Sequence, residues 1–190
     1  SGPLIFWGGA LITDPHQKES HREWILTHEE ILQSVKIFQQ FKQPIHLDLR
    51  KKNILYTKRY RKETCFGVWV KQLSSQHARE AMAALSLIPT IAVSKGFSWA
   101  EGKFWVSVNH KNATKHHAVQ DVANILEISP DEIIAVGDGH NDMPLLQACG
   151  LKIAMGNASE DIKAIADHIV PSVEDDGLVE VINRFVLNNR

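Results

Sequence analysis

Hydrophobic and polar residues alternate in three stretches of the first half of the chain. Ile45, Leu47 and Leu49 alternate with polar neighbours, and the same period of two recurs over 66–70 and 104–108. This period is typical of strands that bury one face and leave the other partly exposed. We therefore expect a sheet with helices on one face and a second face that is free to cover something.

Two amphipathic helices are predicted in the same half of the chain. Thr27 and Glu30 fit a capping box, and apolar residues follow them at helical spacing. A second helical set of apolar residues lies between 78 and 85. The region from about 13 to 108 is thus predicted to be an α+β unit.

From about residue 115 the pattern changes to alternating helices and strands. Residues 133–137 form a short apolar run, and Lys152-Ile153-Ala154-Met155 is interpreted as a second strand of the same kind. Runs of this kind are typical of strands that are buried on both faces of a parallel sheet. Helical patterns precede, separate and follow these runs, so this part is predicted to be half of a doubly wound α/β domain.

Composition and charge narrow the classes of partner. The chain has 190 residues, of which 44% are hydrophobic and 23% charged, with a net charge of -1 and a pI of about 6.8. No broad positive field is present to recruit nucleic acid or an anionic membrane. No apolar run approaches the roughly 20 residues that span a bilayer. We therefore expect neither nucleic acid nor membrane as a partner.

The cysteines and the start of the chain bear on the compartment. Cys65 and Cys149 are far apart and form no metal-binding pair, so we expect free thiols in a reducing cytoplasm. The start, Ser1-Gly2-Pro3, lacks the charged region of a signal peptide. It also lacks an initiator Met, so we expect the chain to be a shortened form of a longer protein.

The strongest chemical feature is Gly137-Asp138-Gly139-His140-Asn141-Asp142, which follows the predicted strand 133–137. Ligands of open α/β sheets bind outside the carboxyl ends of the strands. Asp138 and Asp142 are hard oxygen ligands four residues apart, and they suit Mg2+, which keeps several waters in an octahedral shell. A surface turn with a helix cap is the alternative interpretation.

Neighbouring residues weigh against that alternative. Met155-Gly156-Asn157-Ala158 ends the next predicted strand, beside the same place. Lys115 starts the helix that precedes strand 133–137. A lysine there can place an ammonium group on a phosphate that the metal holds, which neutralises charge during phosphoryl transfer.

These motifs, in this order and spacing, resemble the haloacid-dehalogenase superfamily phosphatases of the Cof-like, sugar-phosphatase branch. The resemblance rests on Thr114 to Val119, on GDGHND at 137–142 and on AMGNA at 154–158, with Lys163, Ala166-Asp167 and Asp176-Gly177 after them. It is close over 109–190 and looser over 3–108.

The resemblance implies an α/β fold: a partial doubly wound, Rossmann-like parallel sheet as the core, with an α+β cap domain inserted into it. Residues 1–12 would be a core remnant that enters the cap, residues 13–108 the cap, and residues 109–190 the C-terminal half of the core. The activity implied is Mg2+-dependent hydrolysis of small sugar or metabolite phosphates.

The resemblance also implies a role for each matching residue. Lys115 is the motif lysine that stabilises and binds the phosphate. Asp138 is the Mg2+ ligand, Asp142 supports the metal, and Asn141 lines the phosphate site. In the family an aspartate attacks phosphorus, and water then hydrolyses the aspartyl-phosphate.

The chain departs from the family at that nucleophile. Neither an apolar strand ending in D-x-D-G-T nor the Ser or Thr of the second motif is present. Asp48 and Asp14 lack the second acid and the glycine, and Asp48 falls within the predicted cap. We therefore expect the chain alone to be inactive, with residues 133–137 meeting another chain, a rearranged strand 3–7 or a companion segment at the exposed sheet edge.

Two other classes of function stay open. One is the phosphorylation domain of a cation-pumping ATPase, although no nucleotide-binding insert precedes the motif. The other is a non-catalytic module of the same fold. Smaller features receive ordinary interpretations: solvated or hydrogen-bonded histidines, a solvated hairpin at the basic stretch 58–62, and core packing for Trp69, Trp99 and Trp105 rather than stacking on a sugar.

Overall fold

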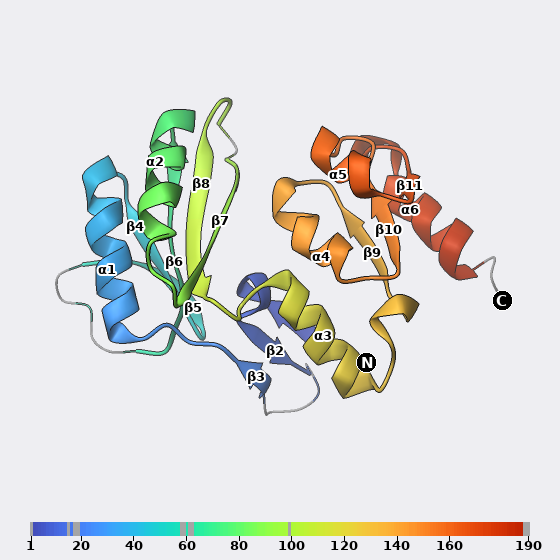
Figure 1. Ribbon diagram of the computed structural model, residues 1–190, viewed down its shortest axis with the longest axis horizontal. Coiled ribbons are helices and arrows are strands. Elements are labelled where there is room, and N and C mark those ends of the chain that lie inside the picture. Colours follow the sequence, from blue (N-terminus) through green and yellow to red (C-terminus); the bar gives the residue numbers. More distant parts are fainter. Residues whose placement is uncertain are drawn as a thin grey trace. The chain divides into compact units, whose positions relative to one another are not determined.

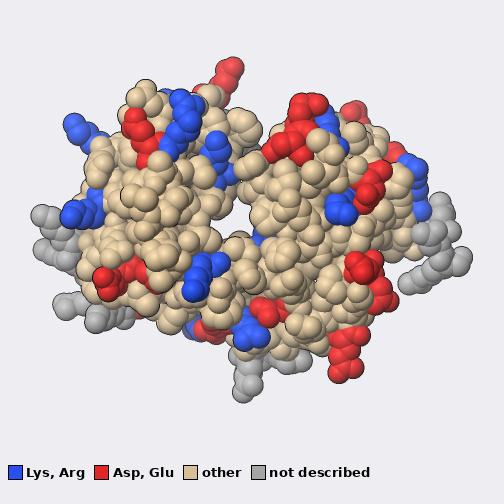
Figure 2. Space-filling model, viewed as in Figure 1, with Lys and Arg blue, Asp and Glu red and all other residues tan. Residues whose placement is uncertain are grey.

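The structure, a computed structural model, divides into two compact units, residues 1–118 and 119–190. Figure 1 shows that both units contain helices and strands. No helix among the described residues is long and apolar enough to cross a membrane. Basic and acidic side chains are interspersed over the surface visible in Figure 2, in keeping with the net charge of -1. The structure describes residues 2–14, 16, 20–57, 60, 63–98 and 100–187.

An antiparallel five-stranded sheet and two helices form most of the first unit. The strand order is β5-β4-β6-β8-β7, and both helices pack on one face of the sheet (Figure 1). The elements are β4 (Ile45–Leu49), β5 (Lys52–Leu55), β6 (Cys65–Leu73), β7 (Ile91–Phe97), β8 (Phe104–His110), α1 (His28–Phe38), α2 (Ser75–Leu85) and a 3-10 turn at Gln39–Phe41.

The start of α1 has the predicted capping box. The Thr27 hydroxyl accepts a hydrogen bond of 3.2 Å from the Glu30 backbone N–H, and the Glu30 carboxylate accepts one of 2.7 Å from the Thr27 N–H. Apolar residues on the inner faces of α1, α2 and the sheet then form one core. Its fully buried members include Phe38, Leu47 and Val106. The predicted strands and helices of this unit are therefore confirmed.

Replacing Phe38 with Ala should strongly destabilise the first unit. The Phe38 side chain is 0% exposed, and its removal leaves a cavity in the core. Changes of this kind cost about 3–5 kcal/mol of unfolding free energy. Phe97, which is 77% exposed, is the matched control, and Phe97→Ala should change stability by less than about 1 kcal/mol. Urea unfolding followed by circular dichroism measures both, and equal losses would contradict this view of the core.

A smaller antiparallel sheet completes the first unit. It consists of β1 (Leu4–Phe6), β2 (Leu11–Thr13) and β3 (Ser20–Glu23) in that order, with a 3-10 turn at Trp7–Gly9 between β1 and β2. Gly9 adopts φ +113, and a Cβ there would lie 2.5 Å from the carbonyl oxygen of Thr114. The turn therefore packs closely against the residue that precedes Lys115.

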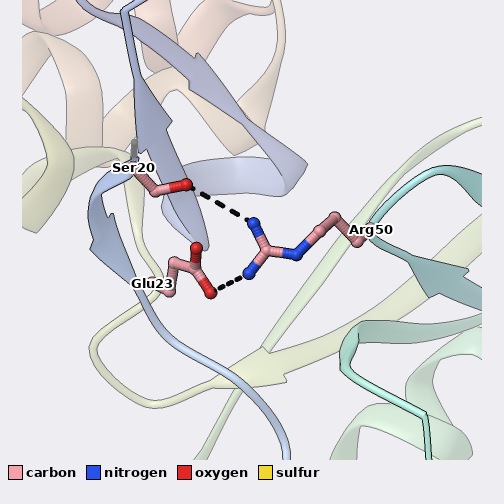
Figure 3. A network of polar contacts seen from close by, with 3 residues as sticks. All are labelled: Ser20, Glu23 and Arg50. Carbon is pink, nitrogen blue, oxygen red and sulfur yellow. Dashed lines mark hydrogen bonds and ion pairs between the residues drawn. The ribbon is translucent and has the colours of Figure 1, made fainter. Parts of the chain in front are cut away.

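Figure 3 shows a polar contact between the two sheets of this unit. The guanidinium of Arg50, which follows β4, donates hydrogen bonds to the Glu23 carboxylate and, at 3.5 Å, to the Ser20 hydroxyl of β3. The Glu23 and Arg50 side chains are 29% and 44% exposed, so solvent screens the pair and its contribution to stability is small.

The Glu23 carboxyl should titrate below its ordinary range. The hydrogen bond from Arg50 lowers the pKa of Glu23 from 4.5, against the opposing effect of burial. A lowered folded-state pKa means that the stabilisation exists above the unfolded pKa and is lost as pH falls through the folded one. Carboxyl-carbon NMR titration should show a lowered Glu23 midpoint that rises in Arg50→Gln. An unchanged midpoint in that variant would contradict the assigned cause.

The second unit contains a parallel three-stranded sheet in the order β11-β10-β9. The long helix α3 (Lys115–Leu126) begins in the first unit and continues in the second. The other elements are β9 (Ile134–Gly137), β10 (Leu151–Ala154), β11 (His168–Ile169), α4 (Met143–Gln147), α5 (Glu160–Ile165), α6 (Gly177–Val181), a π-helix at Ile182–Leu187 and 3-10 turns at Pro130–Glu132, His140–Asp142 and Val173–Asp175.

Both faces of this parallel sheet are packed. Ala154 belongs to a cluster with Leu146 of α4 and Ile162 of α5, whereas its neighbour Ile153 belongs to a cluster with Val181 of α6. Successive residues of a strand point to opposite faces, so helices cover the sheet on both sides. The predicted α/β fold class, with parallel and antiparallel sheets and several helices, is confirmed, whereas the role of the α+β part as a cap stays a prediction.

β9 lies at an edge of its sheet. Within the described part of the chain it pairs with β10, whereas β1 pairs antiparallel with β2. Which of the three expected partners meets the edge of β9, another chain, residues 3–7 or a companion segment, stays a prediction. The assignment of residues 1–12 to the core stays a prediction, as do the boundaries 13–108 and 109–190.

Candidate active site

The predicted acidic turn follows β9 directly and has a defined geometry. The Asp142 carboxylate is buried, and its Oδ2 accepts hydrogen bonds from the backbone N–H groups of Asp138 and Gly139, each at 3.2 Å. Gly137 permits this close approach of Asp142 to the end of β9, because a Cβ at residue 137 would lie 2.7 Å from the Asp142 Cβ and from Leu146 Cδ1. Asp142 therefore holds the turn in shape.

The exposed Asp138 stands at the carboxyl end of β9. Its Oδ2 accepts a hydrogen bond of 3.3 Å from the Asn157 amide of the turn after β10, and the Asn157 Oδ1 accepts one of 3.1 Å from the Val173 N–H. The Ser159 N–H also donates to the Asp138 carbonyl at 3.1 Å. The turns after the neighbouring parallel strands are thus joined at this carboxylate.

Asn157 was given no role from the sequence, although its turn was placed beside the site. The register of the parallel pair, in which Ala154 lies opposite Gly137, sets both turns at the same edge. A polar residue at the end of the adjacent strand is the signal that points to such a neighbour.

The carboxylate oxygens of the acidic turn meet part of what a hard cation requires of its ligands. Asp138 offers an exposed carboxylate, and Asp142 orients the turn that carries it. No group of three or more His, Cys, Asp and Glu side chains that would hold a metal occurs among the residues that the structure describes. Mg2+ accepts a site of this kind because it commonly uses one or two carboxylates with waters and substrate phosphate. These residues fit Mg2+ better than a metal that requires a full protein cage.

Asn141 and His140 lie in the same turn. Asn141 is partly exposed, and its Oδ1 would lie 2.6 Å from a Cβ at Gly139, so the glycine makes room for the amide. His140 Nδ1 pairs with the Asp161 carboxylate at the start of α5. His140 therefore has a partner of its own, while the phosphate-binding role of Asn141 stays a prediction.

Lys115 is the first residue of α3 and belongs to the first unit, whereas Asp138, Asn141 and Asp142 belong to the second. The Thr114 hydroxyl accepts a hydrogen bond of 3.2 Å from the His117 N–H, as the cap of a helix does. The start of the helix, and with it Lys115, is thereby fixed locally. The joint use of Lys115 and the acidic turn stays a prediction.

The two aspartates that were considered as nucleophiles, Asp48 and Asp14, both accept hydrogen bonds within the first unit. Asp48 lies within β4, and its Oδ1 accepts hydrogen bonds from Asn53 and Trp69. Asp14 accepts a hydrogen bond of 2.8 Å from the His16 N–H, in a local turn. Four positions of the basic stretch 58–62 lie outside the described residues, namely Lys58, Arg59, Arg61 and Lys62. Trp99 lies outside them as well.

The core-packing interpretation of Trp69 and Trp105 is wrong. In β6 the core residues are Val68 and Val70, and the partly exposed Trp69 between them points to the opposite face. In β8 the core residues Val106 and Val108 likewise place Trp105 on that opposite face.

The buried, unpaired thiols of Cys65 and Cys149 agree with the sequence prediction.

Comparisons with known proteins place the chain in a family. Over 72 residues it is 43% identical to a chloroplastic endoribonuclease YBEY of Arabidopsis thaliana, a match that covers 38% of this chain and 12% of that protein. Over 83 residues it is 34% identical to a phosphoglycolate phosphatase of Methanopyrus kandleri, covering 44% of this chain and 36% of that protein. The chain thus matches less than half of the length of these relatives.

A solved haloacid dehalogenase-like hydrolase from Bacillus subtilis has the same fold, with a TM-score of 0.81 at 17% identity over 94% of this chain and 78% of that one. The family of haloacid dehalogenase-like hydrolases matches residues 71–182, which is more than half of the chain. The match includes α3, the acidic turn and the turn after β10. The chain therefore belongs to the family of haloacid dehalogenase-like hydrolases.

Proposed function

We propose that the complete protein is a Mg2+-dependent phosphatase that hydrolyses phosphate monoesters of small sugars or related metabolites. The observation that carries this proposal is the exposed Asp138 carboxylate at the end of a parallel strand: the backbone N–H of Asp138 donates to Asp142, and its carboxylate accepts a hydrogen bond from Asn157. Membership of a hydrolase family and the match to a phosphatase support it.

Each site residue has a distinct task in this proposal. Asp138 binds Mg2+, and Asp142 keeps the acidic turn in the shape that presents Asp138. Bound Mg2+ would neutralise charge on the phosphoryl oxygens. Lys115 donates to the phosphate and stabilises charge that develops on it, and Asn141 orients the same group.

The nucleophile comes, in this proposal, from a segment that the 190 residues do not contain. The sequence has no D-x-D-G-T, and Asp48 lies within the antiparallel sheet with hydrogen bonds of its own. A strand that carries the nucleophile would pair with the edge of β9, supplied by a companion segment or another chain. The present chain supplies the cap and the half of the site with the lysine and the metal ligands.

The compartment and the partners follow from the same proposal. Free, buried Cys65 and Cys149 suit a reducing cytoplasm. The partner is a small phosphorylated metabolite, and the charge balance gives no reason to add nucleic acid or a membrane.

Hydrolysis of p-nitrophenyl phosphate, with Mg2+ and with EDTA, tests the proposal. The complete protein should turn over the ester with Mg2+ only, and the 190-residue chain should be inactive. A complete protein that binds Mg2+ but lacks turnover would be a non-catalytic module. Metal-dependent turnover by the 190-residue chain would show that the nucleophile lies within it.

A further inference from the structure

The net charge of -1 conceals a strong difference between the two units. Residues 1–118 contain 17 Lys and Arg against 9 Asp and Glu, whereas residues 119–190 contain 4 against 13. The first unit therefore carries a formal charge of +8 and the second unit one of -9. A positive charge of this size attracts polyanions. The whole-chain balance, from which no nucleic-acid partner is expected, thus does not describe the first unit.

One face of the five-stranded sheet carries no helix of the first unit, and we call it the open face. Register places one row of side chains across β7, β8, β6 and β4, namely Ser94, Ser107, Trp69 and His46. Trp105 of β8 lies in the adjacent row, across from Gly96 of β7. Trp69 and Trp105 are both partly exposed. Two indole rings therefore lie on neighbouring strands of the open face.

The protein supports each of these two rings from one side. The His46 ring stacks on Trp69, with centroids 4.1 Å apart and planes 9° from parallel. Three atoms of the Trp105 ring lie 2.4 to 2.7 Å from the position of a Cβ at Gly96, so the glycine lets the ring lie against the β7 backbone. Aromatic side chains on neighbouring strands of a sheet are a common platform on which the bases of single-stranded RNA stack.

Charged side chains lie on opposite sides of the Trp69 row. Lys71 is exposed, and its Nζ lies 5.8 Å from the centroid of the Trp69 ring. Asp48 lies opposite Gly67, in the row on the other side of Trp69. Its Oδ1 accepts hydrogen bonds from Asn53 and Trp69. Phosphate groups are therefore expected on the Lys71 side of the rings, away from the negative charge of Asp48.

We propose that the open face binds single-stranded RNA. Bases stack on Trp69 and Trp105, and the Lys71 ammonium contacts a phosphate beside them. The hydroxyls of Ser94 and Ser107 are partners for a 2′-hydroxyl, which both donates and accepts. The positive charge of the first unit adds attraction that does not depend on sequence. The inference involves residues of the first unit alone, and it does not rest on the proposed phosphatase function.

Fluorescence anisotropy of a short labelled oligouridylate, titrated with the 190-residue chain, tests the inference. We expect a dissociation constant of about 1–100 µM at physiological salt and weaker binding as the salt concentration rises. The corresponding DNA, oligodeoxyuridylate, should bind several-fold more weakly. Equal binding of the two would overturn the assignment to RNA, and an unchanged anisotropy even at low salt would overturn the site.

Two variants of the open face test the assigned roles. Trp105→Ala should weaken RNA binding about tenfold or more because a base loses its stacking partner, whereas Trp105→Phe keeps a ring and should retain part of the affinity. Lys71→Gln should weaken binding and lower the slope of log affinity against log salt by about one. Arg79→Gln removes the same charge from α2, which covers the other face, and should leave the affinity unchanged. Equal losses in Lys71→Gln and Arg79→Gln would overturn the placement on the open face.

Two further measurements separate stacking from charge. Inorganic polyphosphate offers phosphates without bases, so Trp105→Ala should not change its binding, and an equal loss for polyphosphate and RNA would contradict stacking. In NMR of the unmodified chain, RNA should shift the indole N–H signals of Trp69 and Trp105 but not that of Trp24, whose indole nitrogen is buried. Unmoved Trp69 and Trp105 signals, or binding to phosphatidylserine vesicles in place of RNA, would overturn the inference.

Discussion

Asp138→Asn should lower the Mg2+-dependent phosphatase activity of the complete protein by roughly a hundred- to a thousand-fold. The amide is nearly the same size as the carboxylate, and its oxygen still accepts from Asn157 and leaves the turn intact. It lacks the negative charge that binds Mg2+, so affinity for the metal should fall together with kcat. Steady-state kinetics over a range of Mg2+ concentrations measure both quantities.

Asp131→Asn is the matched control for this prediction. Asp131 is an exposed acid of the 3-10 turn at Pro130–Glu132, in the same unit. Its replacement should leave the activity and the Mg2+ dependence unchanged. Equal losses in both variants would indicate a general effect of charge rather than a metal site at Asp138.

Lys115→Met should also lower kcat, by about a hundred-fold or more, while affinity for Mg2+ is retained. Met preserves the length and the apolar stem of the side chain but removes the ammonium group. The predicted role concerns charge on the phosphate, so the loss should appear in turnover and not in metal binding. Isothermal titration with Mg2+ and steady-state kinetics separate the two effects.

Lys111→Met is the control for Lys115. Lys111 is exposed, and its backbone N–H bonds to Thr90 at 2.9 Å independently of the side chain. This variant should behave as the unmodified protein does. A Lys115→Met variant with normal turnover would remove Lys115 from the site.

Local patterns were sufficient to predict the main elements of both units. The alternation in β4 and β8 and the apolar run at 133–137 report directly which faces are buried. The small sheet of β1, β2 and β3 was missed, because β3 is Ser-His-Arg-Glu and carries no apolar alternation. β3 forms by pairing with β2, where Glu23 lies opposite Leu11 and Arg22 opposite Ile12, and the local pattern of β3 does not report that pairing.

The candidate site was predictable to a similar degree. Asp138 and its place after β9 follow from the motif, because a buried parallel strand must end at the ligand-binding edge. The contact between Asp138 and Asn157 joins turns 19 residues apart, and no local pattern contains it. The orientation of Trp69, by contrast, was within reach of the sequence, because the alternation of the core residues Val68 and Val70 places Trp69 on the opposite face.

The central claim is that Asp138 and Lys115 act on the same phosphoryl group, and a crystal structure with Mg2+ and inorganic phosphate tests it most directly. The account predicts an Asp138 oxygen about 2.0–2.1 Å from Mg2+. It also predicts the Lys115 Nζ at a hydrogen-bond distance of about 2.7–2.9 Å from an oxygen of the phosphate bound to that ion. A phosphate held elsewhere, or a Lys115 side chain directed away from the ion, would contradict the account.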